Sequence, residues 1–441
     1  MSLPSSPTEL QSISRTVLDN GIVVLVKENP AADIIAARLF LRAGSQWETA
    51  QNAGLSHLVS AVLTKGTENR SSLEIAEAVE SVGASLGADS TTDYFLLSLK
   101  TVSADFPGIL KLAGELLRSP TFPEHELELE RRLTLQAIRS QQEQPFNLAF
   151  DQLRQIMYTA HPYALSSLGT EASVVQPQRE DLLAYHKTFF RPDQLIISIC
   201  GRIQPEEAVS LVQQVLGDWQ IPDAETPTLH LPGLEYAPAR RAIAQATQQS
   251  IVMLGYMSPA APLQATTQTN ATADISHLQE YVALKLLNSY LGNGLSSRLF
   301  VELREKRGLA YEVSGFYPTR LHPAQFIVYM GTAPENTQTA LESLHAEVDR
   351  LQLQPLTQQE FQTAKNKLLG QYALGKQTNA QIAQIFGWYE TIGLGIDFDQ
   401  RFQHEVAELP VEIAQVVAQR YLKQPYVSLV GPAEKVMPLV A

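Results

Sequence analysis

The chain has 441 residues, which exceeds the size of a typical single hydrophobic core and indicates two or more domains. Its hydrophobic content of 44% and charged content of 18% are those of an ordinary globular protein, and no apolar run is long enough to cross a membrane. The formal net charge of −13, without any cluster of Lys and Arg, argues against nucleic acid as a partner.

The single cysteine and the N-terminal residues indicate the cellular compartment in which we expect the protein. Cys200 lies inside an apolar run, so we expect a buried strand thiol and no internal disulfide, as is typical of a reducing compartment. Residues 1–15 have the pattern of neither a signal peptide nor a transit peptide. We therefore expect a cytoplasmic protein.

The first half begins with a hairpin signal, because Asn20-Gly21 precedes the β-branched run 22–26. Periodicity then predicts helices and strands in alternation, with Ser71 or Ser72 as a helix cap. The expected strands are 35–42, 94–99 and 195–200. The expected helices are 53–63, 71–82, 124–142 and 181–190.

Residues 222–243 are punctuated by prolines and have little periodicity, which predicts an interdomain linker between domains at 1–221 and 244–441. After the linker the pattern of strands and helices restarts. The expected strands are 250–256, 313–317 and 325–330. The expected helices are 281–291, 297–306, 336–352 and 357–370.

The two halves also end alike. Residues 190–201 and 421–431 each run from a helix end, through a proline, into an apolar strand that ends at a glycine. Two halves of similar length with the same order of elements indicate the internal duplication of an α+β unit.

The segment 54–67 contains part of a zinc-peptidase motif. An inverted zinc motif, H-x-x-E-H, places two histidines one helical turn apart to bind the metal, with a glutamate between them as general base. Here His57 is followed by Ser60 at the glutamate position and by Ala61 at the second histidine position. One imidazole beside a serine and an alanine supplies neither a zinc site nor a base.

A series of short motifs follows the order and spacing of one family over nearly the whole chain. They are Leu18-Asp-Asn-Gly21, Ala43-Gly-Ser45 with Glu48, Gly54-x-x-His57, Lys65-Gly-Thr67, His161-Pro-Tyr163, Leu168-Gly-Thr170, Phe190-x-Pro192, Ser296-Ser-Arg-Leu299 and Leu303-Arg-Glu-Lys-Arg-Gly-Leu-Ala-Tyr311. With them the chain resembles the pitrilysin-type zinc peptidases, in particular the short two-domain branch that includes the mitochondrial processing peptidase. The resemblance implies an α+β fold of two homologous domains, each a mostly antiparallel sheet packed with helices.

The resemblance also implies which of the family's site residues this chain lacks and which it has. The family's third zinc ligand is a glutamate on a later helix, and the aligned position is Ala137. We therefore expect no metal and no cofactor in this chain. In active relatives an arginine and a tyrosine of the second domain bind the substrate carbonyl and donate to the oxyanion, and Arg304 and Tyr311 match them. Alone, the run 304–307 would read as the solvated end of a helix capped by Gly308.

Three hypotheses for the function follow. The first is a non-catalytic, peptide-binding subunit of a heterodimeric metallopeptidase, inactive alone, whose homologous partner has an intact motif and holds the zinc, while Arg304 and Tyr311 act in trans on an extended peptide. The second is a structural or assembly protein of the same fold. The third, which we rank last, is a peptidase with other ligands, for which His161 and His186 are available.

Overall fold

A computed structural model of the chain describes residues 13–262 and 275–440. It has two compact units, and neither is a continuous stretch of sequence. Unit 1 comprises Met1–Leu133, Ser167–Leu229 and Gly375–Ile396, and unit 2 comprises Thr134–Ser166, His230–Leu374 and Asp397–Ala441. Each unit thus includes a segment from the opposite half of the sequence, which the expected boundaries at 221 and 244 did not foresee.

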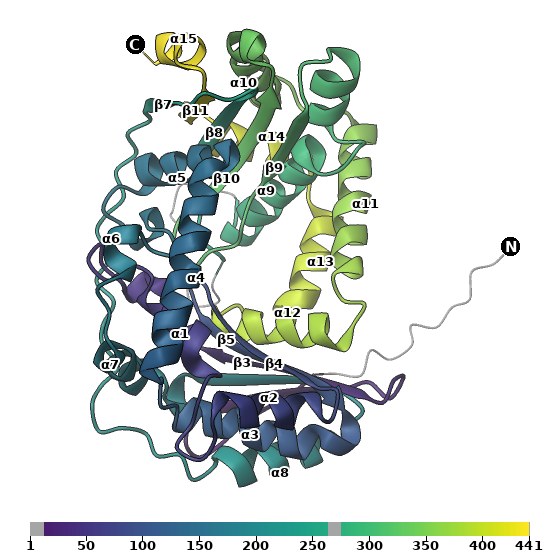
Figure 1. Cartoon of the computed structure of the whole chain (residues 1–441). Helices are drawn as coiled ribbons and strands as arrows, with labels where there is room; N and C mark the ends of the chain where they lie inside the picture. Colours follow the sequence, from purple (N-terminus) through teal and green to yellow (C-terminus); the bar gives the residue numbers. More distant parts are fainter. Residues whose placement is uncertain (1–12, 263–274, 441) are drawn as a thin grey trace, which may run out of the picture. The chain divides into compact units, whose positions relative to one another are not determined.

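Unit 1 is built around a six-stranded sheet in the order β1-β2-β6-β3-β5-β4 (Figure 1). Its strands are β1 Ser14–Val17, β2 Val23–Glu28, β3 Ile34–Leu41, β4 Ser85–Ser90, β5 Phe95–Val102 and β6 Leu195–Gly201. Its helices are α1 Leu55–Leu63, α2 Ser72–Glu80, α3 Phe106–Arg118, α6 Glu171–Val174, α7 Arg179–Phe189, α8 Pro205–Leu216 and α12 Asn379–Thr391. Helix α4, Glu124–Glu143, contains the division between the two units.

Unit 2 is built around a five-stranded sheet in the order β7-β11-β8-β10-β9. Its strands are β7 Arg240–Ala244, β8 Ser250–Ser258, β9 Glu312–Phe316, β10 Ala324–Thr332 and β11 Tyr426–Gly431. Its helices are α5 Pro145–Tyr158, α9 His277–Gly292, the π-helical segment Phe300–Lys306, α10 Thr337–Leu353, α11 Gln358–Leu374, α13 Phe398–Glu408, α14 Val411–Tyr421 and α15 Ala433–Val436.

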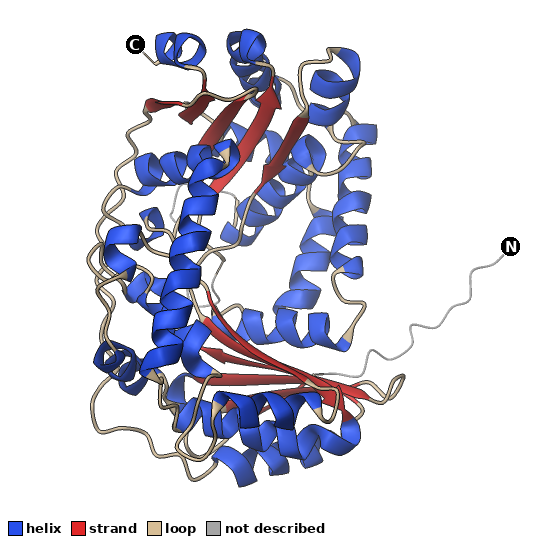
Figure 2. Ribbon diagram, in the orientation of Figure 1, coloured by secondary structure: helices blue, strands red, loops and turns tan. Residues whose placement is uncertain are grey.

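The strand order confirms the duplicated α+β unit. In both sheets one parallel pair, β2 with β6 or β7 with β11, is followed by three antiparallel pairings in the same order (Figure 2). The similar segments 190–201 and 421–431 end in β6 and β11, which occupy equivalent positions. With one parallel pair in each, both sheets are mostly antiparallel, as the family resemblance implied.

Most elements expected from periodicity are present, with two differences of type. Ser71 caps α2, because its hydroxyl accepts from the Glu74 N–H and the Glu74 carboxylate accepts from the Ser71 N–H. Residues 240–243, expected in the linker, form most of β7, and the expected helix 297–306 is largely the π-helical segment.

Helix α12 comes from the C-terminal half of the sequence but packs on β3 and β6 of unit 1 (Figure 1). Gly387 permits this contact, since a methyl group at its Cα would lie 2.3 Å from Cε2 of Phe40. The Glu390 carboxylate accepts from the Arg15 guanidinium at 2.9 Å, and Arg42 donates to the Thr391 carbonyl. Close approach at Gly387 and polar contacts at the C-terminal end of α12 therefore hold the helix on this sheet.

The equivalent exchange in unit 2 places α5, from the N-terminal half, on β8 and β11. Apolar side chains of α5 and of these strands form one buried cluster that includes Leu153, Met157, Met253 and Val430. None of the helices in 13–262 and 275–440 is both long and apolar enough to cross a membrane. Residues 1–12, most of the segment that we searched for a targeting signal, lie outside the described residues.

Candidate functional site

Helix α1, which carries His57, begins at a buried carboxylate. Glu48 is 4% exposed, and its two oxygens accept from the backbone N–H groups of Gly54 at 2.8 Å and Ser56 at 2.6 Å. A carboxylate at this position satisfies otherwise unpaired donors and complements the positive end of the helix dipole. Burial nevertheless raises the pKa of Glu48 to about 7, against the lowering effect of its bonds to Ser56 and Gly54.

The positions around His57 are occupied by local contacts. Burial lowers the pKa of His57, although the charges of Asp89 and Glu130 oppose this shift, so the imidazole is neutral at neutral pH. The Ser60 hydroxyl donates to the His57 carbonyl at 2.7 Å, and Ala61 offers only a methyl group. Across residues 13–262 and 275–440, no three His, Cys, Asp or Glu side chains are grouped to hold a metal.

Ala137, at the expected third ligand position, lies on α4 with an exposed side chain and belongs to unit 2. His57, Ser60 and Ala61 belong to unit 1. The residues at the four family positions therefore supply one imidazole, one hydroxyl and two methyl groups. A catalytic zinc site takes three protein ligands and a water, so these residues do not fit the metal.

Arg304 projects from the π-helical segment with an exposed side chain. Its guanidinium lies over the Phe300 ring, 5.0 Å from the centroid. The segment ends as the sequence predicted at Gly308, whose N–H bonds the Arg304 carbonyl while the Leu309 N–H bonds the Leu303 carbonyl.

The basic side chains of the run 304–307 differ in whether they form ion pairs. Lys306 pairs with Glu302 at 2.8 Å, and Arg307 pairs with Glu347 at 3.4 Å. No carboxylate in the described part of the chain forms an ion pair with Arg304. Two of these cations thus stabilise the helix end, and Arg304 is left available for a ligand.

Tyr311 stands immediately before the edge strand β9, and 60% of it is exposed. Its backbone N–H donates to the Gly331 carbonyl of β10 at 2.8 Å, so the residue is fixed at the sheet edge while its phenol faces solvent. The Gly308 turn separates Tyr311 from Arg304, and both belong to unit 2.

The two histidines of the third hypothesis have structural contacts. His161 is 2% exposed, and its Nδ1 accepts from the Tyr163 N–H at 3.1 Å. The His186 Nε2 lies 2.8 Å from the Leu117 carbonyl. Burial lowers the pKa of each to about 4, and they lie in different units. These contacts argue against a shared ligand role.

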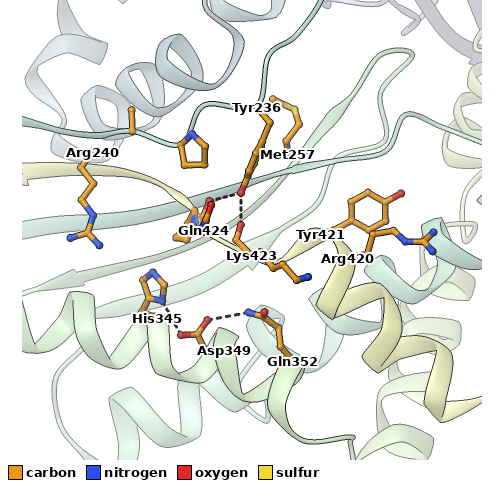
Figure 3. A pocket seen from close by; sticks show the side chains of 13 residues that line it. Tyr236, Arg240, Met257, His345, Asp349, Gln352, Arg420, Tyr421, Lys423 and Gln424 are labelled. Carbon is orange, nitrogen blue, oxygen red and sulfur yellow. Dashed lines mark hydrogen bonds and ion pairs between the residues drawn. The ribbon is translucent and has the colours of Figure 1, made fainter.

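Sequence reasoning missed a cleft in unit 2 that has a volume of about 980 Å³ (Figure 3). Its walls are the segment 236–240, helix α10, the end of α14 and the turn 423–425. Neither Arg304 nor Tyr311 lines it. The only sequence signal was Arg240-Arg241 at the end of the proline-rich segment.

Sequence comparisons place both halves in one family. Residues 23–171 match insulinase (peptidase family M16), and residues 178–368 match the M16 inactive domain. An uncharacterized zinc protease of Bacillus subtilis is 25% identical over 373 residues, covering 84% of this chain and 87% of that protein. An uncharacterized zinc protease of Streptomyces coelicolor is 25% identical over 427 residues, which cover 96% of this chain and 90% of that protein.

Solved structures share the fold. The M16 inactive domain from Pseudomonas fluorescens has a TM-score of 0.85 at 24% identity, covering 95% of this chain and 98% of that one. A protease from Helicobacter pylori has a TM-score of 0.85 at 21% identity, covering 96% and 100%. The two family matches together span most of the sequence and confirm the resemblance that the motifs indicated. The chain belongs to the M16 peptidase family.

Proposed function

We propose that this chain is the non-catalytic, substrate-binding subunit of a two-subunit zinc metallopeptidase. The proposal rests on a contrast between two groups of residues in the family's site, those that bind zinc and those that bind the substrate. The positions for zinc and base hold Ser60, Ala61 and Ala137, whereas Arg304 and Tyr311 are present and exposed. A homologous partner with an intact H-x-x-E-H would hold the zinc and its water.

In this arrangement the chain binds and orients the peptide. The Arg304 guanidinium would donate to a peptide carbonyl, and the Tyr311 hydroxyl would donate to the oxyanion that develops on the scissile carbonyl. Strand β9 begins at Glu312 at an edge of its sheet, so an extended peptide could pair with its backbone beside the phenol. Backbone pairing of this kind depends on the extended conformation of the peptide more than on its amino-acid sequence.

Reconstitution tests the proposal. The isolated chain should contain no stoichiometric zinc and cleave no peptide, and cleavage should appear on mixing with an intact-motif homologue from the same organism. Tyr311→Phe should then lower kcat by about a hundredfold to a thousandfold, the range for loss of one oxyanion donor. Its thermal unfolding should match that of the parent, because the hydroxyl has no hydrogen bond among the described residues.

Matched substitutions separate catalysis from assembly. Arg304→Gln should lower kcat/KM of the mixed enzyme, whereas Arg307→Gln, three residues along, removes the same charge from a side chain that pairs with Glu347 and should have little effect. Unchanged turnover with both Tyr311→Phe and Arg304→Gln would refute the catalytic role and leave the structural or assembly function. One tightly bound zinc in the isolated chain would refute the division of labour itself.

A further inference from the structure

The cleft of unit 2 has a wall whose hydrogen-bond acceptors are already occupied (Figure 3). The Tyr236 hydroxyl donates to the carbonyl oxygens of Lys423 at 2.6 Å and Gln424 at 2.7 Å. Gln352 donates to the Leu422 carbonyl at 2.8 Å. The carbonyl oxygens that follow α14 are therefore satisfied within the protein and offer no free acceptor to a ligand.

The one carboxylate of the cleft is also engaged. Asp349 accepts from the Gln352 amide at 3.1 Å, and its other oxygen lies 3.1 Å from Nδ1 of His345 (Figure 3). At the end of α14, Arg420 pairs with Glu280, which also accepts from the Tyr421 hydroxyl at 2.9 Å. Arg420 and Glu280 thus balance one another, and both oxygens of Asp349 have partners within the protein.

Two cations in the lining have no such balance. Within residues 13–262 and 275–440, neither Arg240 nor Lys423 lies within ion-pair distance of a carboxylate. They stand on different walls, Arg240 at the start of β7 and Lys423 in the turn after α14. The side chains of Arg240 and Lys423 are thus two separate, unpaired positive charges in a protein whose formal net charge is −13. Such a local reversal of sign favours an anionic ligand.

The cleft's size and its helix end narrow the class of anion. A volume of about 980 Å³ corresponds to about thirty water-sized groups of atoms, too many for an inorganic ion and enough for a short peptide segment. The helix terminus at the cleft is the negative C-terminal end of α14, which disfavours a compact polyanion such as a triphosphate. Single carboxylates spaced along a chain suit two separated cations better.

The remaining lining suits the apolar parts of a peptide. Tyr236 is 53% exposed, and Pro238, Met257 and Pro425 add apolar surface to the lining. We propose that this cleft binds an acidic peptide segment, with Asp or Glu carboxylates on Arg240 and Lys423 and apolar atoms against Tyr236. This binding requires neither zinc nor the proposed partner, so it can be tested on the isolated chain.

The test is fluorescence-polarisation titration of the full chain with a labelled peptide of alternating Glu and Leu, beside the same peptide with Gln for Glu. We expect binding of the Glu peptide with a Kd at or below about 1 mM and weakening as salt rises. The double variant Arg240→Gln/Lys423→Gln should weaken binding by about tenfold or more. Circular dichroism of each variant checks the fold.

The chain offers a matched control beside Arg240. Arg241 is the next residue of β7, is exposed and does not line the cleft, because successive side chains of a strand point to opposite faces. Arg241→Gln should therefore leave the Kd unchanged. Equal loss in Arg241→Gln, equal binding of the Gln peptide, absence of binding at about 1 mM, or displacement by ATP at lower concentration than by unlabelled peptide would each overturn the proposal.

Discussion

The glycine beneath α12 gives a direct test of how that helix is held. In Gly387→Ala the added methyl group would lie 2.3 Å from Cε2 of Phe40 and 2.9 Å from Cβ of Ser198, whereas carbon atoms in contact prefer roughly 3.5–4.0 Å. Phe40 is fully buried, so its ring has no free space to move into. Overpacking of this kind costs about 1–3 kcal/mol, and alanine recovers about 1 kcal/mol of helix propensity. We expect a net loss of up to about 2 kcal/mol.

Gly370 provides the control, because it lies in helix α11 and a methyl group there meets no atom within 4 Å. Gly370→Ala should stabilise its helix by about 0.5–1 kcal/mol. The same substitution is thus expected to have opposite signs at two helical glycines. Hydrogen exchange should be read for peptides of α11 and α12 separately, since a chain of two units need not unfold in one step.

A second substitution tests the cause. Phe40→Leu removes the ring edge that the new methyl group meets, so the double variant should be more stable than the sum of the two single effects. If Gly387→Ala protects α12 as much as Gly370→Ala protects α11, the close contact does not limit the helix and the reasoning fails.

Two further predictions concern buried groups. The pKa of Glu48 is raised to about 7 in the folded state from an ordinary 4.5, so stability from this group is full below about pH 4.5 and is lost as pH rises through 7. The free energy of unfolding in urea should therefore fall between about pH 4.5 and pH 7 in the parent but not in Glu48→Gln. Profiles of this free energy against pH that run parallel in the two proteins would contradict the prediction. The Cys200 thiol is buried with a pKa raised to about 11, so iodoacetamide at pH 8 should label the chain only after unfolding. Labelling of the native chain at the rate of a free thiol would refute it.

Local chemistry explains which parts of the fold the sequence predicted. The Asn20-Gly21 turn and the Ser71 cap depend on neighbouring residues, and the structure confirms both of them. The buried thiol of Cys200 followed from the apolar run around it. These features need no knowledge of distant contacts.

The exchange of α5 and α12 could not be predicted in this way. An amphipathic helix shows that it has an apolar face but not which sheet covers that face. The packing of α12 depends on Gly387 meeting Phe40 and on Glu390 meeting Arg15, pairs separated by hundreds of residues. The cleft of unit 2 was missed for the same reason, since the turn at Lys423 joins the segment at Arg240 only in the folded chain.

Helix α1, which carries His57, is held in place by contacts that involve no metal. Helix α1 is held at its start by Glu48 and along its length by buried apolar residues such as Leu58 and Val62, none of which is a zinc position. Ser60 closes a hydrogen bond within the same turn. The zinc positions can therefore lose their ligands without loss of the fold. Arg304 differs, because its exposed guanidinium adds nothing to the paired charges that hold its helix end. Under the proposed function this guanidinium is free to bind a peptide, so substitution of Arg304 tests that function more directly than substitution at the zinc positions does.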